Sequence, residues 1–214
     1  MEGPFRRTDL TEPDLALIET MLWDGTVFPR LAGHMTRLEG AAARFGWPCD
    51  AGGVKTVLQG AVTQGQAARV RLTLAAGGVV AVAVAGLPAS PPVWRLGLAG
   101  VRLMSGDPWL GVKSTRRAGY DAGRAAMAAD LDEVVFLNER GEVCDGSITT
   151  VFFDAGAGLC TPPRSSGLLP GVLRAGMLAE GRCREAVLVA ADLGRVRLWV
   201  GNALRGLMPA LWRG

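Results

Sequence analysis

The chain has 214 residues, of which 49% are hydrophobic and 20% are charged, and its formal net charge is +3. This composition is typical of a globular protein with one large or two modest cores, and it excludes a disordered chain, which would carry fewer apolar residues and more charge. The small positive charge is made mostly of arginine and includes no long basic run, which argues against nucleic-acid binding.

The first part of the chain predicts an α+β unit. Alternating apolar residues between turn signals indicate strands, and apolar residues at helical spacing indicate helices. In chain order, the predicted elements are a strand at 15–22, a helix at 34–46, a weaker helix at 53–65, a β-hairpin at 68–86, and one or two strands at 93–103.

Residues 105–111 are rich in turn formers and read as a linker. The elements predicted after this linker are a helix at 114–129, strands at 132–138, 142–146 and 147–154, a long loop at 161–171, a helix that begins near Pro170, and late strands at 185–190 and 196–203. The whole pattern predicts an α+β fold of two domains. We expect a smaller domain at 1–104 and a larger one at 105–214 that carries Lys113.

The four cysteines favour free thiols in a reducing compartment, because they lie far apart and form no CxxC pair. With one histidine and no cysteine cluster, the sequence predicts no metal site. The N-terminus has charges where a secretory signal needs an apolar segment, and no window approaches the roughly 18 apolar residues of a membrane span. We therefore expect a cytoplasmic protein that does not bind a membrane.

Lysine is rare in this chain, which has only Lys55 and Lys113. Lys113 follows an apolar, turn-rich stretch, and it precedes Arg116 and Arg117 at a predicted helix start. A lysine amine is a useful nucleophile only when its pKa is lowered, and desolvation or nearby positive charge has this effect. The pattern thus makes Lys113 a candidate nucleophile, although a lone lysine at a helix start is more often an ordinary surface residue.

The other acid–base candidates are the single histidine and the single tyrosine, His34 and Tyr120. No GxSxG nucleophile motif accompanies His34, so its position at a helix start favours a structural role. Tyr120 lies on a predicted helix, where a half-buried packing role is more common than an acidic one.

Two segments could bind an anion. The loop SSGLLPGVLR (165–174) leads into a helix start, where backbone N–H groups and the helix dipole attract negative charge. The stretch VGNALRG (200–206), a strand end followed by a turn, could supply a second group of amides. Asp145 follows a turn and could pair with a protonated ring nitrogen. Each segment also fits an ordinary loop, and Asp-Gly is common in simple turns.

Taken in order, these segments resemble the class IV aminotransferases, the fold-type IV pyridoxal phosphate enzymes. That family includes branched-chain and D-amino acid aminotransferases and aminodeoxychorismate lyase. The matching stretches lie between residues 18 and 210 and are ETMLWDG, HMTRL, VKSTRRAGYDAGR, FLNERGEVCDGSITTVF, TPPRSSGLLPGVLR and GNALRGLMPA. The resemblance implies the two-domain fold of that family, pyridoxal 5'-phosphate as cofactor, a small amino acid-like substrate and a homodimer.

The resemblance also implies roles for residues. Lys113 is expected to be the Schiff-base lysine that holds the cofactor and moves the α-proton of the substrate. Asp145, where the family usually has glutamate, is expected to keep the pyridine nitrogen protonated. The expected phosphate ligands are Arg37 and the backbone amides of Val172, Leu173, Asn202 and Ala203. Weaker candidates for substrate binding are Arg116, Arg117 and Tyr120.

The chain departs from the family pattern near its beginning. Members usually carry an additional strand and a DRG…YGDG stretch before the first motif, whereas eighteen residues precede Glu19 here. In family members, that stretch helps to shape the substrate pocket. Arg116 replaces an asparagine common in lyase-like members, whereas Arg117, Tyr120 and the GNALxxxMP pattern match them.

Three classes of function stay open at this point. The first is a pyridoxal phosphate enzyme that either eliminates pyruvate from an aminodeoxychorismate-like substrate or transfers an amino group to a 2-oxo acid; the motif details slightly favour the lyase. The second is a family member that binds the cofactor without turnover and serves as a carrier or an interaction protein. The third is a nucleic-acid-binding α+β protein, which only the arginines support.

Overall fold

The computed structural model describes Phe5 and residues 9–214 and divides the chain into two compact units. The first unit comprises residues 1–89 and 112–116, and the second comprises residues 90–111 and 117–214. These units differ from the expected division at residue 104 in two respects. The strand after residue 93 belongs to the second unit, and Lys113 belongs to the first.

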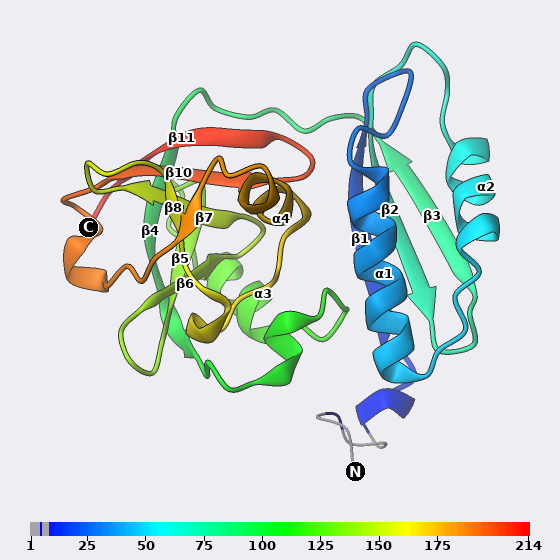
Figure 1. Ribbon diagram of the computed structural model, residues 1–214, viewed down its shortest axis with the longest axis horizontal. Coiled ribbons are helices and arrows are strands. Elements are labelled where there is room, and N and C mark those ends of the chain that lie inside the picture. Colours follow the sequence, from blue (N-terminus) through cyan, green and yellow to red (C-terminus); the bar gives the residue numbers. More distant parts are fainter. Residues whose placement is uncertain (1–4, 6–8) are drawn as a thin grey trace. The chain divides into compact units, whose positions relative to one another are not determined.

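The first unit is a three-stranded antiparallel sheet with two helices (Figure 1). Its strands lie in the order β1 (Ala16–Trp23), β2 (Ala68–Ala75) and β3 (Val80–Ala85). Helix α1 (Leu31–Phe45) packs against β1, and helix α2 (Ala51–Ala61) packs against β3. The predicted first strand, both helices and the hairpin are confirmed.

Helix α1 forms because its apolar residues recur on one face. Met35, Leu38, Ala42 and Phe45 are all buried, at the spacing of about 3.6 residues per turn that a helix requires. The helix ends at Gly46, whose φ of 68° is a left-handed conformation that glycine adopts without a steric penalty. This helix carries two of the candidate residues into the core of the first unit.

A distant segment pairs with β1 on the edge that β2 does not occupy. The Ile18 amide donates to the Lys113 carbonyl oxygen at 2.8 Å, and the Thr115 amide donates to the Ala16 carbonyl oxygen at 2.9 Å. Leu17 and Ser114 form an antiparallel bridge between these two contacts. The backbone around Lys113 is therefore held against β1 by an isolated β-bridge in the first unit.

The second unit is built on an eight-stranded mixed sheet, in the order β6-β5-β4-β11-β10-β7-β8-β9 (Figure 1). The strands are β4 (Trp94–Leu103), β5 (Glu133–Asn138), β6 (Val143–Gly146), β7 (Thr150–Asp154), β8 (Cys160–Thr161), β9 (Arg184–Glu185), β10 (Arg197–Asn202) and β11 (Gly206–Trp212). Helix α3 (Ala118–Ala125) packs against β4 and β5, and helix α4 (Val172–Ala179) packs against β10. The expected α+β class is confirmed.

The core of the second unit lies on its central strands. Leu96, Val135, Val151 and Val200 are each fully buried and belong to one apolar cluster. They come from β4, β5, β7 and β10, so the same packing fixes these four strands, including β10, which ends at the candidate residue Asn202. Short 3-10 turns connect several elements at Asp9–Thr11, Pro108–Gly111, Arg164–Ser166 and Ala190–Asp192.

Two predicted elements differ from the structure, and one strand of the structure was not predicted. The helix expected at 114–129 is α3, Ala118–Ala125, because the residues before it pair with β1 instead. The strand expected at 185–190 is reduced to β9, Arg184–Glu185, and an isolated bridge at Val189. Strand β11 was not predicted. Within residues 9–214, no helix is both long enough and apolar enough to cross a membrane.

Candidate functional site

Arg37 is held in the first unit by a buried carboxylate. Its Nε donates to Glu19 Oε1 at 2.8 Å, and its Nη2 donates to Glu19 Oε2 at 2.6 Å. His34 Nδ1 lies 2.6 Å from the same Oε2. The Glu19 side chain is 3% exposed, and those of His34 and Arg37 are 2% and 14% exposed.

The charge state of Glu19 follows from these contacts. Burial raises the pKa of the Glu19 carboxyl, but the hydrogen bond and charge of Arg37, together with those of His34, lower this pKa by more. The carboxyl is therefore ionised and can only accept hydrogen bonds. The short contact to His34 then requires a proton on Nδ1 of the imidazole.

Two adjacent residues of strand β1 hold Lys113 and Arg37 in place. The Lys113 carbonyl oxygen accepts from the amide of Ile18, and the next residue, Glu19, holds Arg37. Two residues expected to contact the cofactor are thus fixed by consecutive positions of one strand. The sequence did not predict this relation, because the pairing joins segments almost a hundred residues apart.

The arginines after Lys113 are each paired with carboxylates. Arg116 Nη1 lies 3.5 Å from both Asp9 Oδ2 and Glu12 Oε1. Arg117 Nε donates to Asp121 Oδ1 at 2.7 Å, and its Nη2 donates to the Ser147 carbonyl oxygen at 2.8 Å. Because these carboxylates balance the arginine charges, the structure gives little support to the idea that the two arginines lower the pKa of Lys113.

The second unit contains a helix start suited to an anion. Helix α4 begins at Val172, and among the described residues no side chain caps its first turn at Gly171. The first N–H groups of such a helix point out of its end, where the helix dipole favours negative charge. A Cβ at position 171 would lie 3.0 Å from Thr150 Oγ1, so the backbone at this helix start comes close to the side chain of Thr150 in β7.

The end of β10 lies beside this helix start. Gly201 pairs with Thr150 of β7, and a Cβ on Gly201 would lie 2.7 Å from Leu173 Cδ2. Asn202 follows, and its Oδ1 accepts from the amides of Leu204 and Arg205 at 3.1 and 3.0 Å. The structure therefore brings Leu173 of α4 close to Gly201, the residue that precedes Asn202.

Asp145 lies in β6 and is 4% exposed. Its Oδ2 accepts from the amide of Leu169 at 3.3 Å, in the loop that leads to α4. Tyr120 stacks edge-on against Phe136 with ring centroids 5.1 Å apart. Burial, and then the negative charge of Asp145, raise the pKa of Tyr120 well above its ordinary value, so this phenol keeps its proton near neutral pH.

Glu133 is a buried carboxylate near the candidate residues that sequence reasoning missed. It is fully buried in β5, and its Oε1 accepts from the Ser147 amide at 3.1 Å and from the Ser147 hydroxyl. Its Oε2 accepts from the Ile148 amide at 3.1 Å and from Thr149 Oγ1 at 2.9 Å. This carboxylate fixes the loop between β6 and β7, and the Ile148 carbonyl oxygen in turn accepts from Asn202 Nδ2 at 3.3 Å.

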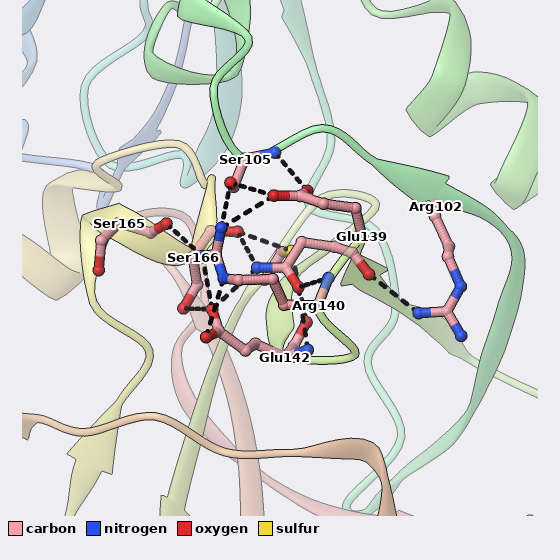
Figure 2. Close-up of polar contacts among 9 residues, drawn as sticks. Arg102, Ser105, Glu139, Arg140, Glu142, Ser165 and Ser166 are labelled. Carbon is pink, nitrogen blue, oxygen red and sulfur yellow. Dashed lines mark hydrogen bonds and ion pairs between the residues drawn. The ribbon is translucent and has the colours of Figure 1, made fainter.

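A polar network centred on Arg140 ties the β5–β6 turn to the loop before α4, as Figure 2 shows. Arg140 Nη2 donates to Glu142 Oε2 and to the Ser165 carbonyl oxygen, both at 2.7 Å. Ser166 Oγ donates to the same Glu142 oxygen at 2.9 Å. The network thereby links the strand of Asp145 to the loop that delivers α4.

Several of these contacts leave a signal in the sequence. Glu19 is a charged residue in an apolar strand, and Glu133 opens another apolar strand. A carboxylate in such a position needs hydrogen-bond partners, although the sequence does not say which. Thr150 leaves no such signal, because threonine is common in ordinary strands.

The structure also bears on metals and thiols. Within the described residues, no group of three or more His, Cys, Asp or Glu side chains could hold a metal ion. The cysteines Cys49, Cys144, Cys160 and Cys183 are all free. Burial raises the pKa of the Cys144 thiol to about 12, which makes it a poor nucleophile at neutral pH.

Comparisons with known proteins give relatives along almost the whole chain. The chain is 29% identical over 182 residues to the Schizosaccharomyces pombe protein named "Putative aminodeoxychorismate lyase", covering 79% of this chain and 75% of that one. A crystal structure named "Putative amino-acid aminotransferase", from Mesorhizobium loti, is 44% identical, with a TM-score of 0.86, and covers 94% of this chain and 100% of that one.

A third similarity, at lower identity, concerns the fold. A hypothetical aminotransferase from Mycobacterium tuberculosis in its PLP-bound form shares the fold, with a TM-score of 0.78 and 22% identity over 95% of this chain and 85% of that one. The family model for class IV amino-transferases matches residues 16–211. The chain therefore belongs to the class IV aminotransferase family, whose members depend on pyridoxal 5'-phosphate.

Proposed function

We propose that this protein is a pyridoxal phosphate-dependent enzyme that acts on an amino acid-like substrate. The observation that supports it best is the arrangement around β1. The backbone of Lys113 is bonded to Ile18, and the adjacent Glu19 holds Arg37 at 2.6 and 2.8 Å.

The groups that the cofactor requires are an amine, an anion site and a carboxylate. Lys113 would supply the amine, and Asp145 would contact the ring nitrogen. Arg37 and the amides of Val172, Leu173, Asn202 and Ala203 would bind the phosphate. The start of α4 at Gly171, which no side chain of the described residues caps, fits a phosphate, because the first backbone N–H groups of a helix attract negative charge.

When bound, pyridoxal phosphate supplies an aldehyde that condenses with amines and a protonated ring that withdraws electrons from the substrate Cα. The protein's own part is then proton transfer and orientation. Lys113 Nζ takes the Cα proton as a general base. Asp145 holds the proton on the ring nitrogen, although its side chain is one methylene shorter than the glutamate usual in the family.

Our first candidate reaction is elimination of pyruvate, as in 4-amino-4-deoxychorismate lyase. The similarity to the S. pombe protein and the match at Arg117, Tyr120 and GNALxxxMP support it. The second candidate is amino transfer to a 2-oxo acid, which the 44% identity to the M. loti protein supports. Both reactions use the same lysine and differ in the step after proton removal.

The first test is the visible absorbance spectrum of the purified protein before and after borohydride. We expect a yellow band that borohydride bleaches and that Lys113→Ala lacks. A protein that stays colourless after incubation with pyridoxal phosphate would refute the proposal. Product assays would then separate the reactions, because the lyase yields pyruvate and an aromatic amine, whereas the transaminase yields a new amino acid.

The same assays test the non-catalytic alternative. A protein that binds one cofactor per chain but turns over no substrate in either panel would be a carrier or an interaction protein. We also propose a homodimer in the cytoplasm. The four free cysteines fit a reducing compartment. Light scattering at micromolar concentration would contradict the dimer if it gave the mass of one chain.

A further inference from the structure

We propose that Glu19 and His34 are positioning residues that fix the guanidinium of Arg37 for the cofactor phosphate. The inference rests on the proposed function, in which Arg37 binds that phosphate. It assigns a purpose to a buried, charged cluster in the first unit that the fold by itself does not require. All three side chains belong to β1 and α1, so the argument uses one compact unit only.

The geometry restricts Arg37 to one orientation. Two parallel hydrogen bonds, from Nε and Nη2 to the two oxygens of Glu19, hold one edge of the planar guanidinium. These bonds use two of the five N–H donors, and the other three lie on Nη1 and Nη2. The carboxylate thus selects which edge of the guanidinium is presented to a ligand.

His34 fixes the carboxylate itself. Its Nδ1 lies 2.6 Å from Oε2, the same oxygen that accepts from Arg37 Nη2. His34 precedes Arg37 by three residues on α1, so both side chains lie on one helix face. Glu19 therefore receives donors from both residues and cannot rotate without breaking several bonds.

A structural role alone explains this cluster poorly. Glu19 is flanked in β1 by Leu17, Ile18 and Met21, all of which are 1–2% exposed. An apolar residue would pack at such a position without the desolvation penalty of a buried ion, which its partners often fail to offset fully. A carboxylate at this position is better explained by what it does to Arg37.

Charge and position predict opposite effects of removing Glu19. Its negative charge opposes the attraction between Arg37 and a phosphate, so a purely electrostatic role predicts tighter phosphate binding when Glu19 is neutralised. A positioning role predicts weaker binding, because glutamine presents an N–H₂ group where a donor of Arg37 or His34 needs an acceptor. The sign of the change therefore distinguishes the two roles.

The experiment compares binding of pyridoxine 5'-phosphate and pyridoxine by calorimetry. Neither ligand carries an aldehyde, so Lys113 cannot form a covalent bond with them, and they differ only in the phosphate. We expect the wild-type protein to bind the phosphate ester more tightly than pyridoxine. In Glu19→Gln, the ratio of the two affinities should be roughly tenfold smaller, which is the effect of losing one charge-assisted hydrogen bond. Binding of pyridoxine should not change.

Two further variants keep the test informative if Glu19→Gln does not fold. His34→Leu removes the donor to Glu19 and should also weaken the preference. His34→Asn places an amide nitrogen near the position of Nδ1 and should restore most of it. Glu39→Gln is the matched control, because Glu39 is an exposed glutamate two residues from Arg37 on the same helix. This variant should prefer the phosphate ester as strongly as the wild-type protein does.

The outcomes separate this inference from the proposed function. If wild-type protein does not prefer the phosphate ester, the phosphate site is wrong and both proposals fall. If wild type shows the preference and Arg37→Met loses it, but Glu19→Gln keeps or increases it, the positioning role alone is overturned. Equal loss in His34→Leu and His34→Asn would also contradict it.

Discussion

The carbonyl oxygen of Lys113 accepts a hydrogen bond from the amide of Ile18 at 2.8 Å. This contact fixes the backbone of Lys113 and therefore the point from which its side chain extends. Ordering a lysine costs both backbone and side-chain entropy. Because the backbone of Lys113 is already fixed, only the side-chain entropy is lost when its amine binds a partner. The pairing of 112–116 with β1 is therefore part of the candidate site.

The side chain of Thr115 strengthens this pairing. Thr115 Oγ1 accepts from the Ala16 amide at 3.0 Å and donates to the Asp14 carbonyl oxygen at 2.8 Å. Thr115→Val keeps the shape and removes both bonds. We expect a loss of about 1 kcal/mol in the free energy of unfolding and faster hydrogen exchange at the Ile18 amide.

Thr56→Val is the control for this prediction. Its Oγ1 donates only to the Gly52 carbonyl oxygen within helix α2, at 3.1 Å. Such a local bond adds little to a helix, so the variant should change stability by less than about 0.5 kcal/mol. Equal exchange at Ile18 in Thr115→Val and wild type would show that the side chain does not hold the segment.

Gly201 sets the distance between β10 and α4. A Cβ there would lie 2.7 Å from Leu173 Cδ2 and 3.0 Å from the Gly206 carbonyl oxygen. Gly201→Ala should destabilise the protein by about 1–3 kcal/mol, as overpacking does, and should weaken cofactor binding because it displaces the start of α4. Urea unfolding and cofactor titration measure the two effects.

The matched substitution is Gly40→Ala. Gly40 lies on the exposed side of α1, and a Cβ there would meet nothing within 4 Å. We expect this variant to be as stable as wild type or up to about 1 kcal/mol more stable, because alanine favours a helix. A similar loss in both glycine variants would mean that the contact with Leu173 is not the cause.

The sequence predicted those elements whose signal is local. The apolar spacing of α1 and the hairpin of β2 and β3 are read directly from neighbouring residues, and both are confirmed. The start of α3 is different. Residues from Ser114 to Arg117 have ordinary helix-forming neighbours, yet the structure begins α3 at Ala118 because the backbone before it bonds to β1. Such long-range pairing has no local signature.

Strand β11 shows a second reason for failure. Its sequence contains Pro209, which normally argues against a strand. Pro209 lies opposite Trp199 of β10, and the parallel pairing with β4 begins only at Ala210. Because β4 does not pair with Pro209, the N–H group that proline lacks is not needed for a hydrogen bond to β4. Side-chain pairs such as Glu19 with Arg37 could not be predicted either, since a sequence gives the residues but not their partners.

Glu133 should be essential for stability. It is fully buried, and its two oxygens accept from the main chain and side chains of residues 147–149. Glu133→Gln replaces one acceptor by a donor and leaves buried N–H groups without a partner. We expect a loss of about 2–4 kcal/mol in the free energy of unfolding, measured by urea denaturation.

The control for Glu133 is an exposed ion pair. Glu180 Oε2 lies 3.2 Å from Arg182 Nη1, and both side chains are about 60% exposed. Glu180→Gln should change the free energy of unfolding by less than about 0.5 kcal/mol. If Glu133→Gln were equally mild, the buried carboxylate would not be what holds the loop.

The Arg140 network predicts a loss of stability in acid. Hydrogen bonds from the side chain and backbone of Ser105 lower the pKa of Glu139 from 4.5 to about 2. Hydrogen bonds from Arg140 and Asn138 lower the pKa of Glu142 from 4.5 to about 2. A carboxyl whose pKa is lower in the folded state stabilises that state above its unfolded pKa, and this contribution disappears as the pH falls towards the folded value.

The stability from these two carboxylates should therefore be complete above about pH 5 and should fall between about pH 4.5 and 2. Urea midpoints at pH 6, 4 and 3 measure this dependence. The double variant Glu139→Gln/Glu142→Gln should be less stable than wild type at pH 6 but should lose less between pH 6 and 3, because its amides do not titrate. Parallel curves for the two proteins would show that other carboxyl groups cause the acid sensitivity.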